Sequence, residues 1–263
     1  FASPSRVKFS IVPVNDLKSS QFKEYSDALF KVNEVRLVDV STSQGLFNPQ
    51  AYPQGRITYN FTTESDDTES LFLQDFDPFR KVFGTIGIAH WTPDLTDEKL
   101  KKIHEELKKE FNNSISHFIM IFDSPAEYQS STEFVHVVNK NLDNIETSVC
   151  DFSVTFLESL SSYASSYQHV TLRSPGTIIG SSSIRPNSTL KEKQKRRISG
   201  SLDINQDKIK QHRTKGRRLK ISANFFLLAG NLKSAITDFC ESIFNLRFAN
   251  DYLWLASALD GLA

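Results

Sequence analysis

The sequence predicts an α/β fold, a mostly parallel sheet flanked by helices, followed by the start of an all-α solenoid of the tetratricopeptide-like kind. Strand-like and helix-like stretches alternate over residues 1–168, as they do where helices cover both faces of a parallel sheet. The chain has 263 residues, of which 39% are hydrophobic, enough for one α/β core and an appendage. From residue 221 onward the pattern is helical only. We therefore expect an α/β domain at 1–168, a linker at 169–220 and solenoid helices at 221–263.

The first half of the α/β domain reads as strand, helix, strand and strand. Residues 7–14 form an apolar run ended by turn residues, and residues 35–40 form another. Between them, Ser19 or Ser20 is expected to cap a helix with an apolar side. Residues 56–61 alternate between apolar and polar, which predicts a strand with one solvent-facing side. The apolar side of the helix consists of Phe22, Tyr25, Leu29 and Val32.

The second half continues with connector, strand, helix and strand. Residues 71–79 are apolar but broken by acidic residues and Pro78, which predicts a short helix or packed loop. A buried strand is expected at 82–89, and a helix capped by Thr96 follows it. Residues 117–122 are expected to be the last strand, before a long helix with one apolar face. That face consists of Val149, Phe152, Phe156, Leu160, Tyr163 and Tyr167.

This order of elements resembles that of a small GTPase, but the sequence lacks the phosphate-binding loop. Such a loop needs glycines so that backbone N–H groups can wrap the phosphates, together with a lysine that reaches them. The corresponding residues, 15–20, contain no glycine and place Asp16 where phosphate charge would lie. Residues 139–143 imitate a guanine-reading motif, but with one residue too many and beyond the expected last strand. We expect no nucleotide site.

No other catalytic, cofactor or metal site is predicted. The sequence has no Gly-x-Ser-x-Gly elbow, and its six histidines show no metal-ligand spacing among themselves or with cysteine. Cys150 and Cys240 are expected to be free thiols in a reducing compartment, and no apolar run is long enough to span a membrane. We expect a cytoplasmic protein that is not an enzyme.

The linker is predicted to be largely disordered and is strongly basic. Between residues 191 and 220, twelve lysines and arginines face only three carboxylates, and few apolar residues are available for a core. Without interleaved aromatic residues the segment is not expected to bind nucleic acid. It is either a solvated linker or a contact for anionic lipid. Ser199 is a candidate phosphorylation site, and the candidate lipid-facing residues are Lys195, Arg196, Arg197, Arg217 and Arg218.

The last forty or so residues resemble part of a helical repeat. A short helix at 224–229 ends at Gly230, a second helix follows, and a third apolar stretch begins at Asp251. Because such a hairpin needs stacked neighbours to bury its apolar face, we expect the chain to be the front part of a longer scaffold. Its start at Phe1 instead of Met fits a trimmed fragment. The expected apolar face of the second helix consists of Leu232, Ile236, Phe239, Ile243 and Leu246.

Four stretches of the sequence together resemble a specific family. They are residues 39–55, residues 71–81, residues 169–176 and residues 251–261. They are similar to the N-terminal part of the large NIBP-type subunit of the fungal TRAPP II vesicle-tethering complex. The resemblance covers about residues 5–262 and is weakest in the basic linker.

The resemblance implies a scaffold role without catalytic residues. Members have an N-terminal α/β domain, a helical solenoid and C-terminal immunoglobulin-like domains, and the complex acts at the Golgi as a nucleotide-exchange factor for Rab GTPases. The implied partners are other TRAPP subunits and, by a contact that the sequence does not define, a Rab GTPase. Two alternatives remain: a regulatory nucleotide-binding GTPase-like domain, and a membrane-binding module that uses the basic linker. Phe76, Pro78, Phe79 and Arg80 form a candidate motif for packing or for an interface.

Overall fold

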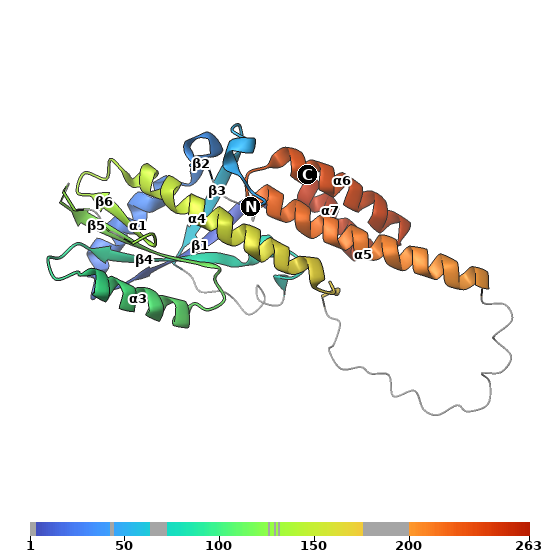
Figure 1. The fold of residues 1–263 in the computed structure, drawn as a ribbon, viewed down its shortest axis with the longest axis horizontal. Helices are drawn as coiled ribbons and strands as arrows, with labels where there is room; N and C mark the ends of the chain where they lie inside the picture. Colours follow the sequence, from blue (N-terminus) through green and yellow to red (C-terminus); the bar gives the residue numbers. More distant parts are fainter. Residues whose placement is uncertain are drawn as a thin grey trace, which may run out of the picture.

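The computed structural model describes residues 4–42, 45–63, 73–125, 127–128, 130, 132–175 and 200–263, with side chains from residue 205 in the last range. An α/β layer structure lies at one end of the molecule and the C-terminal helices lie at the other (Figure 1). The sheet has the strand order β2-β3-β1-β4-β5-β6, and only the β2–β3 pair is antiparallel. The mostly parallel sheet that the sequence predicts is therefore confirmed. The strands are β1 (Arg6–Pro13), β2 (Glu34–Arg36), β3 (Arg56–Thr62), β4 (Val82–His90), β5 (Ser116–Ser124) and β6 (Val135–Asn139).

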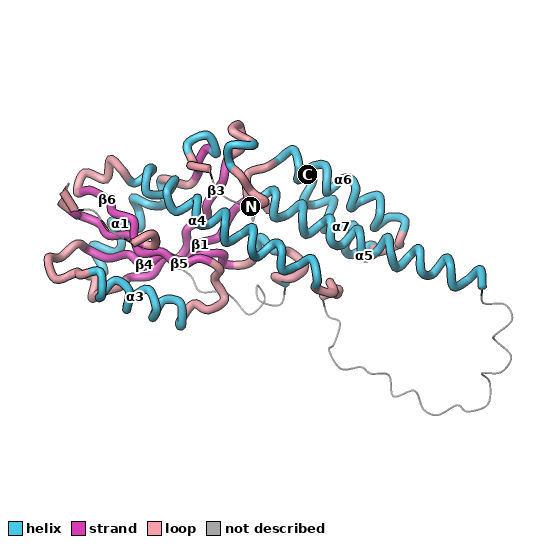
Figure 2. The backbone as a smooth tube through the Cα atoms, viewed as in Figure 1, coloured by secondary structure: helices cyan, strands magenta, loops and turns pink. Residues whose placement is uncertain are grey.

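Helices connect the strands and extend beyond the sheet (Figure 2). Three lie in the α/β part: α1 (Ser19–Lys31), α3 (Asp97–Glu110) and α4 (Ile145–Ser166). The other three are α5 (Gly200–Leu228), α6 (Leu232–Phe248) and α7 (Tyr252–Leu262). Four single turns of 3-10 helix complete the described elements: η1 (Leu37–Asp39), η2 (Pro49–Ala51), η3 (Pro78–Arg80) and η4 (Tyr167–His169).

Three predictions about the α/β part were wrong in detail. The expected strand at 35–40 is only β2, because the chain turns into η1 at Leu37. Residues 117–122 are not the last strand, since β6 pairs with β5 beyond them. The N-cap of α1 is Lys18, whose side chain makes no capping hydrogen bond. The Thr96 cap is confirmed, because its hydroxyl accepts from the Lys99 amide.

Alternation along β5 separates two apolar layers. Phe118, Met120 and Phe122 face one layer, whereas Ile119 and Ile121 face the other. On the first face, Tyr25 of α1 stacks on Phe122 at 4.5 Å between ring centroids, and Phe152 of α4 stacks on Phe118 at 5.2 Å. On the second face, Leu100 and Leu107 of α3 pack against the two isoleucines. Helices α1 and α4 thus cover one face of the sheet and α3 covers the other.

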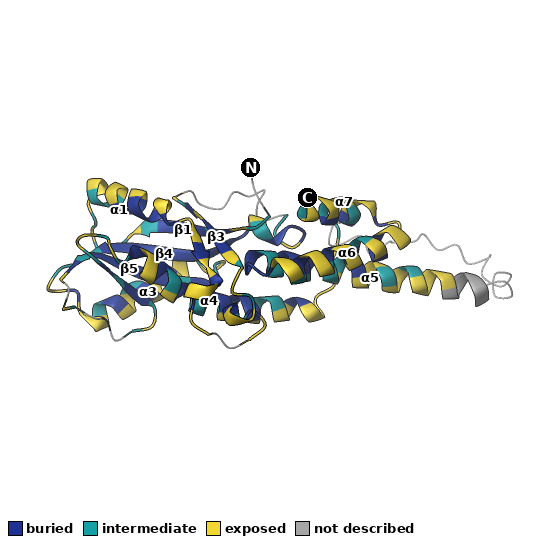
Figure 3. Ribbon diagram, turned by 90° about the horizontal axis from the view of Figure 1, so that it is seen from above, coloured by how far each residue is buried: buried dark blue, intermediate teal, exposed yellow. Residues whose placement is uncertain are grey.

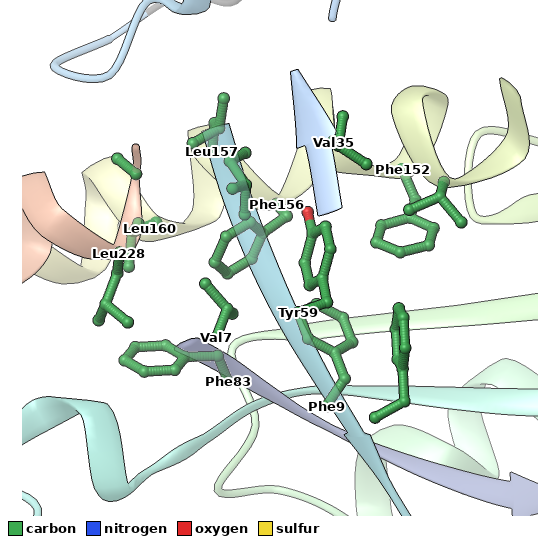
Figure 4. Packing of buried hydrophobic residues seen from close by; sticks show 14 of the residues in the cluster. Val7, Phe9, Val35, Tyr59, Phe83, Phe152, Phe156, Leu157, Leu160 and Leu228 are labelled. Carbon is green, nitrogen blue, oxygen red and sulfur yellow. The ribbon is translucent and has the colours of Figure 1, made fainter. Parts of the chain in front are cut away.

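The centre of the larger layer is a cluster of aromatic rings (Figure 4). Phe9 on β1 lies 5.4 Å from Tyr59 and 5.5 Å from Phe156 between ring centroids. A Cβ on Gly84 would lie 2.0 Å from the Phe9 ring, so the neighbouring strand leaves room for this ring only by carrying glycine. Leu228 of α5 belongs to the same cluster, which therefore runs from the sheet into the helical part.

The helical part corrects the expected linker boundary at residue 220. Helix α5 begins at Gly200, so residues 200–220 are helical, while residues 176–199 lie outside the described residues. The helix is stabilised by packing on α6: Gly216 lies against Leu246, and His212 Nδ1 lies 2.8 Å from Asn245 Oδ1. Tertiary contacts of this kind stabilise a helix whose own composition does not predict it.

The expected buried face of α6 was also wrong at its start. Phe239 and Leu246 are buried, but Leu232 and Ile236 are 59% and 44% exposed. The buried positions begin at Ala235 and include small and polar residues that contact α5, such as Ser242, which donates to the Gly216 carbonyl. A pattern that counts only large apolar residues misses such a face.

Candidate functional site

The carboxyl ends of the strands form the edge where open α/β sheets bind ligands. The strand order reverses at β1, which has β3 on one side and β4 on the other, and the ligand crevice of such folds lies beside that point. The loop after β1 turns through Asn15 and Asp16, with φ of 56° and 54°. A carboxylate at this place opposes a bound phosphate, and the loop has no glycines that would let its amides surround one.

A cluster of three side chains connects α1, the helix that follows this loop, to the carboxyl ends of β4 and β5. The Tyr25 hydroxyl on α1 donates to Asp123 Oδ2 at 2.7 Å and lies 2.7 Å from His90 Nδ1. Burial, followed by the hydrogen bond to Asp123, raises the pKa of Tyr25 above its ordinary value, so the hydroxyl keeps its proton. The cluster satisfies its own polar groups across the ends of β4 and β5. No sequence motif had pointed to it, since its members lie up to 98 positions apart.

The guanine-motif-like residues 139–143 begin at Asn139, the last residue of β6, so they lie at the end of the last strand and not well past it, as a last strand at 117–122 had led us to expect. Asn144 holds this turn: its Oδ1 accepts from the Asn139 amide and its Nδ2 donates to the Val137 carbonyl, both at 2.8 Å. The turn also contains Leu142 with φ of 61°. Residues 139–143 therefore form the turn between β6 and α4, and the Asn144 side chain stabilises it.

The second candidate site is the joint between the α/β part and the helices, built around Asp77 and Lys220. The Lys220 side chain is 1% exposed, and its Nζ donates to Asp77 Oδ1 at 2.8 Å and to the Phe76 carbonyl. Ser257 on α7 donates to the same carboxylate oxygen at 2.8 Å. Burial by itself would raise the pKa of Asp77, but the charge and hydrogen bond of Lys220 hold it below its ordinary value. One carboxylate thus joins η3, α5 and α7.

Aromatic rings enclose this ion pair. Phe76 meets Trp254 of α7 edge to face at 4.8 Å between centroids, and Lys220 Nζ lies 4.7 Å from the Phe76 centroid. The guanidinium carbon of Arg217 lies over the Trp254 ring, 5.0 Å from its centroid. Its Nε donates to Asp251 Oδ2 at 2.7 Å, which adds a second ion pair at the joint.

The residues that the sequence singled out divide between this joint and the surface. Phe76 and Pro78 are buried in the joint, Phe79 is half-buried, and the Arg80 side chain is 41% exposed. Arg217 does not face solvent as a lipid contact would, because its side chain is 14% exposed and fully engaged. Arg218 is exposed. The predictions for Lys195, Arg196, Arg197 and Ser199 lie outside the described residues.

Sequence reasoning missed Asp77, Lys220 and Ser257 as members of one site. Lys220 had been counted with the basic linker, and Asp77 as one of the acidic residues that break the apolar stretch at 71–79. One signal was present in the sequence: Lys220 is directly followed by an apolar helical stretch, where a lysine needs a buried partner.

The described residues hold neither a metal site nor a membrane span. No three histidine, cysteine, aspartate or glutamate side chains in these residue ranges are grouped so that they could bind a metal ion. None of the helices in the described part of the chain combines the length and apolarity that a membrane span requires.

The fold and the two sites define a class of protein: a nucleotide-fold-like α/β domain with no phosphate loop, carrying a docked helical unit. The family model for the Trs120/TRAPPC9 N-terminal domain matches residues 1–209 and 186–263. The chain belongs to the Trs120/TRAPPC9 family, which confirms the resemblance seen in the sequence.

Two relatives cover almost the whole chain. The chain is 30% identical to the Trafficking protein particle complex II-specific subunit 120 of Saccharomyces cerevisiae, over 100% of this chain. It is 26% identical to the Transport protein particle subunit trs120 of Schizosaccharomyces pombe, over 99% of this chain. The chain spans about a quarter, 24%, of the length of each relative.

Proposed function

We propose that this chain is a non-catalytic scaffold part of a TRAPP II-type tethering complex, acting at Golgi membranes within a nucleotide-exchange factor for Rab GTPases. The family membership carries this proposal, since one relative is named as a subunit specific to trafficking protein particle complex II and the other as a transport protein particle subunit. In this role the α/β domain supplies rigid surfaces for other subunits, and the exchange chemistry belongs to those subunits.

The filled edge of the sheet supports a scaffold over a working GTPase. Tyr25, His90 and Asp123 bond to one another at the edge where a nucleotide would be bound. The Asn15–Asp16 turn adds a carboxylate where phosphate would need positive charge. In a scaffold that keeps this fold but binds no nucleotide, hydrogen bonds between protein side chains, such as those of Tyr25, hold α1 against the sheet in place of contacts with a ligand.

The outer part of η3 is the surface that we propose for another TRAPP subunit. Phe76 and Pro78 are used inside the joint, whereas Phe79 is half-buried and Arg80 is exposed, with its guanidinium carbon 5.3 Å from the Phe79 centroid. Aromatic and arginine side chains at a rigid surface are typical anchors of protein interfaces. Because η3 is fixed by the joint, such an interface would be pre-organised.

A pull-down of the chain with purified TRAPP core, combined with a GTPγS titration on the same sample, tests the proposal. We expect binding to the core and no nucleotide affinity. Nucleotide binding in the micromolar range would overturn our interpretation of the Asn15 loop and favour a regulated GTPase-like domain. Failure to bind the core in the absence of nucleotide affinity would contradict the proposed contact.

A matched pair of variants localises that contact. Phe79→Ala with Arg80→Glu should reduce core binding at least tenfold. It should also lower the unfolding temperature, because Phe79 packs partly against the core and Arg80 Nε donates to Asp77 Oδ2 at 3.3 Å, so circular dichroism has to show that the variant is folded at the temperature of the assay. Lys208→Glu, an exposed position on α5, serves as the charge control and should bind like the unaltered chain. Equal binding by all three proteins would remove η3 from the interface.

A further inference from the structure

A groove runs between the end of α4 and the part of α5 from Asp207 to Phe225. It has a volume of about 1050 Å³ and is open to solvent. Its α5 wall extends from Asp207 to Phe225, which corresponds to about 27 Å at 1.5 Å per helical residue. Figure 3 shows the contrast along this helix from residue 205 onward: the described residues are mostly exposed at first and increasingly buried towards the C-terminal end. We call this feature the α4–α5 groove.

The floor of the groove is apolar. Tyr167, Ile221 and Phe225 lie at the bottom of the groove and are only 8%, 2% and 1% exposed. An occupant must therefore insert side chains into the groove to reach them. Leu172 and Leu219 are half-buried beside them. A partner that places apolar side chains along this floor would bury apolar area on both sides, which favours association.

The rim of the groove is basic and includes cations without a counter-ion. Lys210, Lys215 and Arg218 line it, against the single carboxylate of Asp207. Lys215 pairs with Glu241 at 2.6 Å, but neither Lys210 nor Arg218 forms an ion pair with any residue in the described ranges. Two unpaired cations beside an apolar floor fit a partner whose flank is acidic.

The chain's own basic segment has the wrong charge to fill the groove. Residues 176–199 carry six lysines and arginines and one glutamate, so they are repelled by the rim. A flat bilayer does not fit either, because the apolar residues lie at the bottom of a groove between helices and not on a convex face.

The secondary structure of the groove favours a helix as the occupant. Every lining residue belongs to α4, η4, α5 or a loop, and none belongs to a strand whose backbone could pair with an extended peptide. A helix satisfies its own backbone hydrogen bonds and can lay an apolar stripe on the floor. We propose that the α4–α5 groove binds an amphipathic helix of a partner protein, with leucine-type residues on the floor and glutamate or aspartate facing Lys210 and Arg218.

A defined probe tests this without knowledge of the natural partner. The probe is a fluorescein-labelled 18-residue helical peptide with leucines at i, i+3, i+4 and i+7 positions and glutamates on one flank. The control peptide has lysine at every glutamate position. We expect the acidic peptide to bind the chain, as measured by fluorescence anisotropy, and the basic peptide to bind at least tenfold more weakly.

Two pairs of variants assign the binding to the groove. Lys210→Glu with Arg218→Glu should weaken the acidic peptide at least tenfold, whereas Lys208→Glu with Lys233→Glu makes the same change in net charge at exposed sites outside the groove and should weaken it far less. Thr214→Trp fills the groove from its exposed wall and should also abolish binding, while Thr237→Trp on exposed α6 should not. Circular dichroism and the unfolding temperature confirm that each variant is folded.

Three outcomes would overturn the proposal. The acidic peptide fails to bind, or both double variants weaken it equally, which would make the attraction one of net charge alone. In the third, vesicles of phosphatidylcholine with phosphatidylserine bind in a manner that depends on Lys210 and Arg218 while the peptide does not. The groove would then be a lipid contact.

Discussion

Among the histidines of the described residues, His136 on β6 has the most strongly shifted pKa. Its ring lies between Phe118 and Phe152, at 5.5 Å and 5.9 Å between centroids, and its Nε2 has no hydrogen-bond partner among the described residues. Burial lowers the pKa of His136 to about 4, so the ring is neutral in the folded protein near pH 7. In the unfolded chain the same ring has an ordinary pKa of about 6.5.

This difference predicts that the protein loses stability between about pH 6.5 and pH 4. In that window the unfolded state binds a proton that the folded state does not, so the free energy of unfolding falls as pH falls, by about 3 kcal/mol for His136 at about 1.4 kcal/mol per pKa unit. Urea unfolding at a series of pH values measures it, and His136→Leu should flatten the curve, whereas exposed His169→Gln should not. An unchanged slope in His136→Leu would assign the loss to other groups, including His104 and His117, whose pKa values burial also lowers.

The Asp77–Lys220 pair predicts a non-additive pair of substitutions. Asp77→Ala leaves the Lys220 ammonium buried without a counter-charge, which should lower the free energy of unfolding by about 3–5 kcal/mol. Asp77→Ala combined with Lys220→Met removes both charges and should cost clearly less than the two single losses together. A double-mutant cycle by urea unfolding measures the coupling, and additive losses would show that the two side chains do not depend on each other.

The pH dependence of this pair falls in a lower window than that of His136. Because the pKa of Asp77 is depressed in the folded protein, its stabilising contribution is present above an ordinary aspartate pKa of about 3.9 and is lost as pH falls through the folded value. Below about pH 4 the free energy of unfolding should therefore fall more steeply with decreasing pH in the unaltered chain than in the double variant.

At the scale of elements, the turn between α5 and α6 meets the start of β3. Gly230 has φ of 78°, and a Cβ there would lie 2.6 Å from the Arg56 carbonyl oxygen. Gly55 faces it in return, since its Cβ would lie 2.3 Å from the Gly230 carbonyl oxygen. Two glycines from elements far apart in the chain thus allow backbone to touch backbone and fix where the helices dock.

Gly230→Ala should lower the free energy of unfolding by about 2 kcal/mol or more, because the left-handed conformation and the contact with Arg56 both oppose a side chain. Asn250→Ala is the matched control, since Asn250 has φ of 52° and is exposed in the α6–α7 turn. Asn250→Ala should lower the free energy of unfolding by a smaller amount, because only the cost of the left-handed conformation applies at this exposed position. Gly230→Asn separates the two causes: asparagine tolerates the left-handed region, so a rescue would mean that space at Arg56 is not limiting.

The elements that sequence reasoning recovered are those with a strong period of their own. The strands at residues 56–62 and 82–90, and the helix at 97–110, match the predictions closely because alternation, a fully apolar run and a threonine cap are local signals. Strand β6 was missed because it is only five residues long and includes His136. The burial of His136 depends on Phe118 of β5 and Phe152 of α4, which its local sequence does not show. The first half of α5 was missed because its partner, α6, lies later in the chain.

The candidate sites depended even more on long-range contacts. Tyr25 was predicted as a core residue, but its partners His90 and Asp123 lie 65 and 98 positions away. Lys220 and Asp77 are 143 positions apart, and nothing in either local sequence indicates the other. The missing glycines of a phosphate loop can be read from residues 15–20 alone, whereas Tyr25, His90 and Asp123 are brought together only by the fold.

For the whole molecule, the hydrophobic core is continuous from the sheet to the last helix. One cluster contains Phe9 of β1, Leu228 of α5 and Trp254 of α7. With the buried ion pair of Lys220 and the glycine contact at Gly230, it makes the joint an internal part of the fold. A unit whose core and polar contacts are shared in this way is expected to unfold cooperatively.

The two tryptophans of the chain allow this cooperativity to be measured on each side of the joint. Trp91 follows β4 and packs near Tyr128 in the α3 layer, whereas Trp254 lies buried on α7 against Phe76. In the single-tryptophan variants Trp254→Phe and Trp91→Phe, we expect fluorescence from the remaining ring and far-UV circular dichroism to give the same midpoint within each variant. The midpoint of Trp254→Phe should be the lower of the two, because phenylalanine leaves space in the joint. A helical unit that melts before the α/β domain would show itself as an earlier midpoint for Trp254 fluorescence in Trp91→Phe. That result would mean that the joint is a hinge, and the rigid placement of η3 that the proposed interface requires would then have to come from a partner.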